Sequence, residues 1–190
     1  MKVIAINGSA RKNGNTAFLI DTVFSELHSK NIETEVFNLS GHIIGGCRAC
    51  GACYKNKDNK CIFDDDPVNE IIEKIIKADG VILASPTYFA DVSSEMKAVI
   101  DRVGYVARAN GNLLKRKPCA SIVAVRRAGA MRAFDSMNAL FLIGEALIVG
   151  SDYWNIGYGW GKGEVSDDEE GMATMKKLGE NMAWLLNKLK

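Results

Sequence analysis

The chain has 190 residues, of which 47% are hydrophobic and 25% are charged, a composition typical of a globular protein with a full core. Its formal net charge of +1 offers no broadly basic face for nucleic acid, and its apolar runs are too short to cross a membrane. The first residues form an apolar strand pattern rather than a signal peptide. We therefore expect one cytoplasmic domain over residues 1–190, in a reducing compartment, without nucleic-acid or membrane partners.

Short apolar runs alternate with amphipathic segments along the chain. Strands are expected at residues 2–7, 34–39, 80–85, 119–125 and 148–156. Helices are expected at residues 15–29, 64–76, 94–106, 133–147 and 167–190. The first strand is nearly all apolar, which is typical of a parallel strand covered on both faces. The alternation predicts a flavodoxin-like α/β fold, a doubly wound, five-stranded parallel sheet in the order 2-1-3-4-5 with helices on both faces.

Ligands of such sheets bind outside the carboxyl ends of the strands, where the strand order reverses. The loop from Gly8 to Thr16 follows the first strand and opens a helix. Its backbone N–H groups, the hydroxyls of Ser9 and Thr16, and the Arg11 cation can hold a phosphate. Neither a Gly-x-Gly-x-x-Gly nor a Gly-Lys-Thr sequence is present, so a monoester phosphate is favoured over a dinucleotide or a nucleoside triphosphate. The plainer alternative is an ordinary strand-to-helix turn, which favours the same residue types.

Two further loops should reach the same edge of the sheet. Tyr88 and Phe89 follow the third strand, where aromatic side chains can lie against a planar ring. The alternative is that both pack on the following helix. Arg126 and Arg127 follow the fourth strand, and a cation near one edge of a flavin stabilises its reduced, anionic form. For one of these arginines, a surface ion pair is the favoured alternative.

Four of the five cysteines lie within 15 residues, in a long loop expected at about residues 41–66. They are Cys47, Cys50, Cys53 and Cys61. Iron–sulfur clusters are held by four thiolates at spacings of this kind, whereas structural zinc usually takes two separated pairs. Zinc and reduced thiols without metal remain alternatives, and disulfides are disfavoured in a reducing compartment. Cys119 lies within a strand and is interpreted as a small buried hydrophobe.

Together, three motifs resemble the iron–sulfur flavoproteins, within the NAD(P)H-dependent FMN reductases of the flavodoxin-like superfamily. They are Gly8-Ser-Ala-Arg-Lys-Asn-Gly-Asn-Thr16, the segment from Ser85-Pro-Thr-Tyr-Phe to Ile-Asp-Arg102, and the four-cysteine loop. The first two are shared with the wider reductase family and are typical of FMN binding. The cysteine loop distinguishes the iron–sulfur branch, and the resemblance covers most of the chain.

The resemblance implies two cofactors and their sites. The FMN phosphate would be held by Ser9, Arg11, Asn13, Asn15 and Thr16. The isoalloxazine ring would contact Pro86, Thr87, Tyr88 and Phe89, with Arg127 and Gly129 near its far edge. A 4Fe–4S cluster would be ligated by Cys47, Cys50, Cys53 and Cys61. No catalytic side chain is expected, because the electrons pass through the flavin.

The resulting hypothesis is an FMN-dependent oxidoreductase, or electron-transfer flavoprotein, in which a 4Fe–4S cluster relays electrons to or from FMN. NAD(P)H or a reduced electron-carrier protein would be the donor, and the resemblance implies a homo-oligomer, either a dimer or a tetramer. One alternative is an NAD(P)H-dependent FMN or quinone reductase without a cluster. The other is a non-catalytic flavodoxin-like carrier with a structural metal, which would need a strongly charged docking face.

Overall fold

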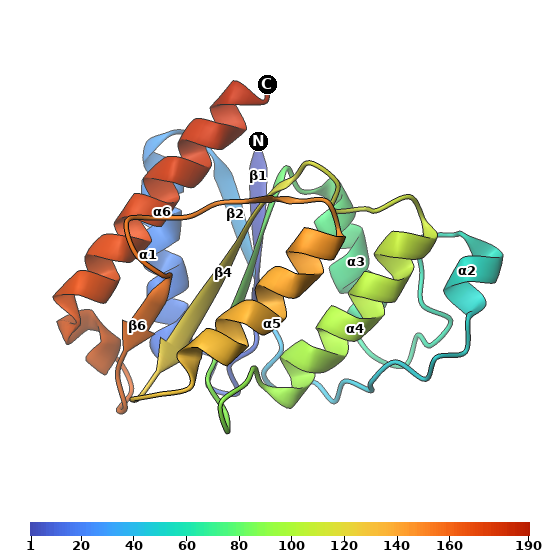
Figure 1. Ribbon diagram of the computed structural model, residues 1–190, viewed down its shortest axis with the longest axis horizontal. Helices are drawn as coiled ribbons and strands as arrows, with labels where there is room; N and C mark the ends of the chain where they lie inside the picture. Colours follow the sequence, from blue (N-terminus) through green and yellow to red (C-terminus); the bar gives the residue numbers. More distant parts are fainter.

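The computed structural model describes residues 1–190 and contains one six-stranded parallel sheet. The strands are β1 (Lys2–Asn7), β2 (Glu33–Asn38), β3 (Gly80–Pro86), β4 (Pro118–Val125), β5 (Leu147–Ile148) and β6 (Ile156–Tyr158). The order is β2-β1-β3-β4-β5, and β6 also pairs with β4 (Figure 1). The predicted order 2-1-3-4-5 and the flavodoxin-like fold are therefore confirmed.

The predicted continuous fifth strand is wrong. In its place β5 pairs with the start of β4 and β6 pairs with the end of β4, and the chain between them leaves the sheet. Asn155, which is buried, fills the gap: its Nδ2 donates to the Ser121 carbonyl at 3.1 Å and its own carbonyl accepts from the Val123 amide at 2.9 Å. The polar run from Gly150 to Asp152 has no apolar face to bury, so this segment follows the surface instead.

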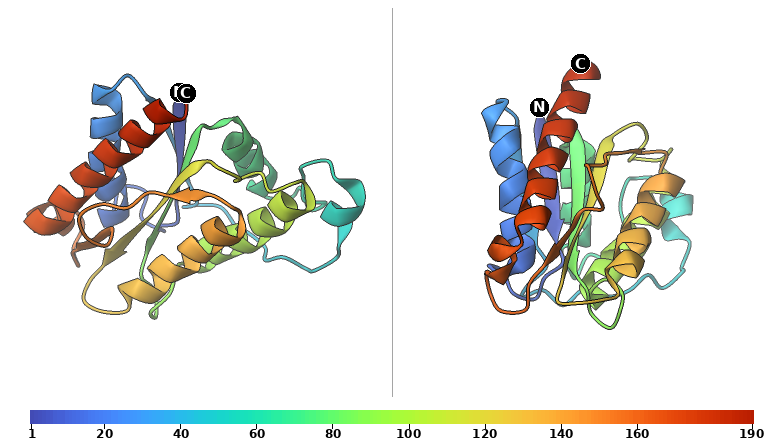
Figure 2. Two further views of the ribbon diagram at one scale, coloured as in Figure 1. Left: turned by 45° about the horizontal axis from the view of Figure 1, so that its top comes forward. Right: turned by 60° about the vertical axis from the view of Figure 1, so that its left-hand side comes forward.

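The helices form a layer on each face of the sheet (Figures 1 and 2). They are α1 (Asn15–Ser29), α2 (Ala52–Asn56), α3 (Val68–Lys77), α4 (Ser94–Ala109), α5 (Ala130–Ile143) and α6 (Glu169–Lys188), with a 3-10 turn η1 (Glu164–Asp167). α1 and α6 cover one face, and α3, α4 and α5 cover the other. α2 lies within the cysteine loop beside α4 and was not predicted, because five residues are too few to show a helical period.

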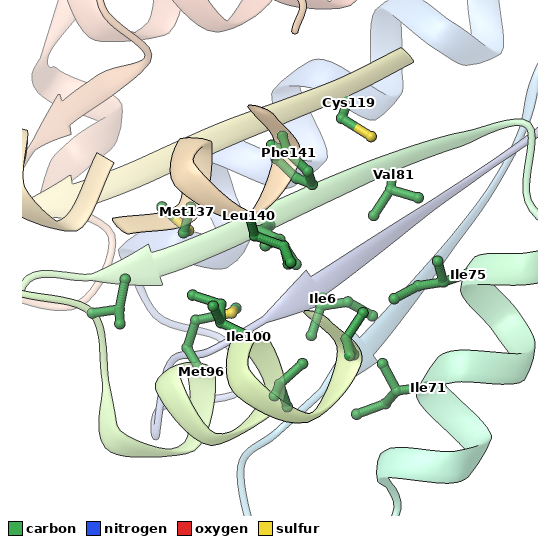
Figure 3. Packing of buried hydrophobic residues seen from close by; sticks show 14 of the residues in the cluster. Ile6, Ile71, Ile75, Val81, Met96, Ile100, Cys119, Met137, Leu140 and Phe141 are labelled. Atoms are coloured by element: carbon green, nitrogen blue, oxygen red, sulfur yellow. The ribbon is translucent and has the colours of Figure 1, made fainter. Parts of the chain in front are cut away.

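Two apolar cores follow from the alternation of side chains along each strand. Ile4 and Ile6 of β1 point toward α3, α4 and α5, while Val3 and Ala5 point toward α1 and α6. Figure 3 shows the first core, in which Phe141 of α5 lies over β3 and β4. None of the helices combines the length and the apolar character that a membrane crossing requires.

All the parallel strands point their carboxyl ends to one edge of the molecule (Figure 1). The loops that follow β1, β3 and β4 therefore meet there. The cysteine loop also leaves β2 at this edge, but it then runs past the N-terminal end of α4 to α2 on the outer side of the helix layer (Figures 1 and 2). The two groups of predicted site residues thus occupy different parts of the molecule.

Replacing Phe141 by alanine should lower the free energy of unfolding by about 3–5 kcal/mol, because a fully buried ring leaves a cavity in the core. Leu142→Ala is the matched control, since Leu142 is 68% exposed and its truncation should cost less than about 0.5 kcal/mol. Urea unfolding followed by circular dichroism measures both changes. Similar losses in the two variants would contradict the assigned core.

Candidate functional site

The loop after β1 is shaped by local side-chain bonds to the backbone. The buried Asn7 accepts the Ser9 amide on its Oδ1 at 3.0 Å and donates from Nδ2 to Asn38 at 2.9 Å. The Ser9 hydroxyl in turn accepts the Arg11 amide at 3.1 Å. These bonds turn the chain from β1 toward α1 and tie the turn to β2.

The start of α1 is suited to an anion. The helix begins at Asn15, with no side-chain cap and no acidic residue in its first turn. Its first N–H groups are therefore available to a ligand, and the helix dipole favours a negative charge there. Thr16 is buried in the first turn. The side chain of Asn15 accepts the Gly163 amide at 2.8 Å, which fixes the loop after β6 against the start of α1.

A hollow of about 170 Å³ lies at this point, between the loops that follow β1, β3, β4 and β6. Its lining residues are Ser9, Arg11, Gly14, Asn15, Thr16, Pro86, Thr87, Tyr88, Ala124, Arg126, Gly159 and Trp160. The structure thus brings most of the predicted phosphate and ring residues together. Asn13, Phe89, Arg127 and Gly129 lie outside the lining of this hollow.

Thr87 is the polar group in the hollow that most needs a partner. Its amide donates to the Ala124 carbonyl at 2.9 Å, which holds the residue against β4. Its hydroxyl Oγ1 is buried and has no hydrogen-bond partner in the protein. A buried hydroxyl without a partner costs about 1–3 kcal/mol, and a ligand with a polar edge would recover that cost.

The turn after Thr87 presents aromatic side chains outward. Tyr88 and Asp91 exchange two backbone hydrogen bonds, at 2.8 and 3.1 Å. Between them Phe89 and Ala90 have φ angles of 49° and 64°, in the left-handed region that few non-glycine residues adopt. Phe89 is fully exposed, so it does not pack on the following helix, which was the plainer interpretation.

The loop after β4 packs directly on this turn. Gly129 has a φ of 85°, and a Cβ atom there would lie 2.8 Å from Ala90, so only glycine fits. Gly129 and Arg127 line a neighbouring cavity of about 250 Å³. It is Arg126 that lines the hollow, where its guanidinium lies 4.0 Å from the centre of the Trp160 ring, a favourable cation–π geometry.

Arg126 was expected at this edge together with Arg127, and the hollow is lined by Arg126. Gly159 and Trp160 were not predicted at the hollow. Both belong to a glycine-rich run after β6 whose position depends on the split of the fifth strand. A signal was nevertheless present, because any segment that follows a parallel strand of this sheet emerges at the ligand edge.

The four clustered cysteines line a separate cavity, of about 180 Å³, between α2 and α4. Left-handed φ angles at Ala49 (51°) and Gly51 (71°) curl the chain between them. The side chain of Asn69 holds the end of the loop. Its Oδ1 accepts from the Cys61 amide at 2.8 Å, and its Nδ2 donates to the Cys61 carbonyl at 2.9 Å. The structure therefore turns four thiols that are spread over 15 residues toward one space.

No three His, Cys, Asp or Glu side chains lie close enough together to hold a metal ion. A single zinc would need its four sulfurs about 3.8 Å apart, from a Zn–S distance of about 2.3 Å. Iron–sulfur clusters are held by four cysteine thiolates, and four thiols line this cavity, so the set of donors fits such a cluster.

Arg102 of α4 forms the inner wall of the cysteine cavity. Its guanidinium is ion-paired with Asp66, and the side chains are only 2% and 6% exposed. It also donates to the carbonyls of Gly45 at 3.2 Å and Phe63 at 2.8 Å, so it ties both ends of the cysteine loop to the helix. The Arg102 Nε is buried without a partner.

Cys119 is separate from this cavity. It lies in β4 and is fully buried, and burial raises the pKa of its thiol to about 12. The thiol is therefore neutral at physiological pH and behaves as a small hydrophobe, as predicted.

Comparisons with known proteins show the family of the chain. Residues 1–161 match the NADPH-dependent FMN reductase family. The chain is 32% identical to an iron–sulfur flavoprotein of Methanocaldococcus jannaschii, covering all of both proteins. It is also 30% identical to an iron–sulfur flavoprotein of Methanosarcina thermophila, over 98% of this chain and 95% of that protein.

Solved structures share the fold at low identity. RosB with a bound riboflavin-phosphate intermediate has a TM-score of 0.77 and 19% identity, covering 100% of this chain and 80% of that one. An archaeal flavodoxin has a TM-score of 0.63 and 14% identity, covering 98% of this chain and 99% of that one.

The match over residues 1–161 shows that the chain belongs to the NADPH-dependent FMN reductase family, a family of flavodoxin-like oxidoreductases. Within that family it belongs with the iron–sulfur flavoproteins.

Proposed function

We propose that the protein is an FMN-dependent oxidoreductase whose flavin exchanges electrons with a 4Fe–4S cluster in the cysteine cavity. NAD(P)H or a reduced electron-carrier protein would be the donor. The observation that carries the flavin part is the hollow at the start of α1, where the unpartnered Thr87 hydroxyl and free N–H groups meet. Bound FMN would supply chemistry that no side chain offers, because it takes up two electrons and can release them singly.

The proposal assigns roles to the residues of the hollow. Ser9, Arg11, Asn15 and Thr16 would hold the phosphate, with the exposed Asn13 as an outer contact. Pro86, Thr87, Tyr88 and Phe89 would contact the ring. Arg126 lies in the hollow itself, and Arg127 and Gly129 would border the ring from the neighbouring cavity. No side chain acts as a nucleophile, so the protein positions and polarises the flavin.

The cluster would be ligated by Cys47, Cys50, Cys53 and Cys61. The cysteine cavity and the flavin hollow share no lining residue, and α2 lies on the far side of α4 from the hollow (Figures 1 and 2). We therefore expect a homo-oligomer, in which a second subunit brings a cluster to the flavin. Four aromatic side chains near the flavin edge are about half exposed, namely Tyr153, Trp154, Tyr158 and Trp160. They support an interface there, because aromatic residues are enriched in the cores of protein interfaces.

A second candidate is an NAD(P)H-dependent FMN or quinone reductase without a cluster. The absence of a group of side chains close enough to bind a metal ion favours it. In that case the flavin hollow would keep its role, and the cysteine loop would carry free thiols.

Thr87→Val tests the flavin hollow. Valine keeps the shape but removes the unpartnered hydroxyl, so the flavin-free protein should be as stable as the wild type or more stable. FMN binding should weaken by roughly fivefold, the equivalent of about 1 kcal/mol for one hydrogen bond. Flavin fluorescence quenching and urea unfolding measure the two effects.

The matched control is Thr22→Val, because the Thr22 hydroxyl bonds the Phe18 carbonyl on α1, away from the hollow. Its FMN affinity should stay at the wild-type value. Unchanged affinity in Thr87→Val, or FAD as the heat-released cofactor, would reject the assigned hollow.

Anaerobic addition of NADPH, NADH or a reduced ferredoxin should bleach the visible absorbance of the bound flavin, because the proposed reaction begins with flavin reduction. Stopped-flow absorbance would identify which donor reacts. If every donor leaves the flavin oxidised, the protein only binds FMN.

Protein purified without oxygen should contain about four iron atoms per chain and matching sulfide. Cys50→Ser should abolish the iron while FMN stays bound, because Cys50 does not line the flavin hollow. Cys119→Ala, which lies in β4 away from the cysteine cavity, is the control and should keep its iron. One tightly bound zinc, with no iron after anaerobic reconstitution, would leave the reductase without a cluster.

A further inference from the structure

We propose that the buried ion pair of Arg102 and Asp66 sets the reduction potential of the iron–sulfur group. Arg102 is a positioning residue that stabilises the reduced form and raises the potential, and Asp66 lowers the potential. This inference rests on the proposed cluster. It concerns residues that bind neither the iron nor the flavin, and it starts from the position of one buried cation.

Arg102 differs from the other charged residue on the cavity wall. Arg48 also lines the cavity, but it is exposed and stacks on Phe63 at 4.3 Å, where water screens its charge. Arg102 is buried, and α4 holds it rigidly against the cysteines. A buried charge is screened much less than a surface one, so Arg102 contributes most to the potential inside the cavity.

The hydrogen bonds of Arg102 leave part of its charge uncompensated. Nη1 donates to Asp66 and to the Gly45 carbonyl, and Nη2 donates to the Phe63 carbonyl. The Nε donor is buried without a partner. A guanidinium is not deprotonated in proteins, so Arg102 is cationic in both redox states of the group.

The consequence for electron transfer follows from charge. One electron from the flavin or the donor adds one negative charge to the four-thiolate group, and Arg102 neither takes up nor releases a proton. Net charge and hydrogen bonds to sulfur are two of the factors that set the potential of such groups. A buried cation stabilises the extra negative charge and raises the potential, while the Asp66 carboxylate opposes it and lowers the potential.

The same ion pair also ties the cysteine loop to α4, so a purely structural role has to be separated from an electrostatic one. Removing one partner leaves a buried charge unpaired, which destabilises a protein. Two variants, Asp66→Asn and the double variant Arg102→Gln/Asp66→Asn, both break the tie, but the first adds one net positive charge beside the cavity and the second leaves the net charge unchanged. A structural role predicts parallel effects in the two variants, whereas an electrostatic role predicts a raised potential in Asp66→Asn and a return toward the wild-type potential in the double variant.

The experiment is an anaerobic redox titration of the iron-loaded holoprotein, followed by electron paramagnetic resonance, with iron, FMN and urea stability measured on the same samples. We expect Asp66→Asn to raise the midpoint potential by about 59 mV, a tenfold change in the ratio of oxidised to reduced group. The double variant should fall below Asp66→Asn by a similar shift. Arg102→Lys keeps the charge and should stay near the wild type.

The control is Arg108→Gln, which removes an exposed cation from the same helix, outside the lining of the cysteine cavity. Its potential should not move, and the flavin potential should be the same in every variant. Equal potentials across the iron-loaded series would overturn the inference. It would also be overturned if both Asp66 variants lost their iron while Arg102→Lys kept wild-type iron and stability. Wild-type protein without iron would instead reject the proposed cluster itself.

Discussion

Parallel pairing of β1 with both β2 and β3 is the constraint on which the rest of the molecule depends. Because β1 is hydrogen-bonded on both sides and covered on both faces, its residues from Val3 to Asn7 are fully buried. The chain passes from β1 to β2 through α1 on one face of the sheet and from β2 to β3 through α3 on the other, which opens a crevice at the carboxyl edge. The start of α1 and the turn after β3 meet at that crevice, so the flavin hollow is a product of the topology.

The carboxyl edge carries polar and strained groups that the core excludes. The Asn7 side chain forms hydrogen bonds that shape the loop after β1, and the buried Thr87 hydroxyl has no hydrogen-bond partner. Phe89 and Ala90 adopt a left-handed conformation, and only glycine fits at position 129, because a Cβ atom there would clash with Ala90. The unpartnered hydroxyl and the left-handed turn each lower the stability of the protein, whereas the bonds of Asn7 hold the loop in place. Polar and strained groups are thus gathered at the edge where our proposal places FMN.

The cysteine cavity is organised by α4 rather than by the sheet. Arg102 reaches from the helix to the carbonyls of Gly45 and Phe63, so the loop is closed over a buried charge. The carboxyl group of Asp66 is held below its ordinary pKa, because hydrogen bonds from Arg102 and from the amides of Val68 and Gly45 outweigh burial. One helix therefore links the apolar core, through its Met96 and Val103 side, to the space between the thiols.

The sequence by itself determined the strand order, the position of α1 to the residue, and the three loops at the ligand edge, because apolar period and helix-start chemistry are local properties. Local pattern could not show that the fifth strand is split, since Asn155 replaces the missing pairing with bonds to β4. Nor could it choose Arg126 over Arg127 for the hollow, because neighbouring loop residues point in different directions. Arg102 looks like a surface residue of an amphipathic helix. Only the return of residues 45–66 across α4 buries it, and that contact joins segments more than thirty residues apart in the chain.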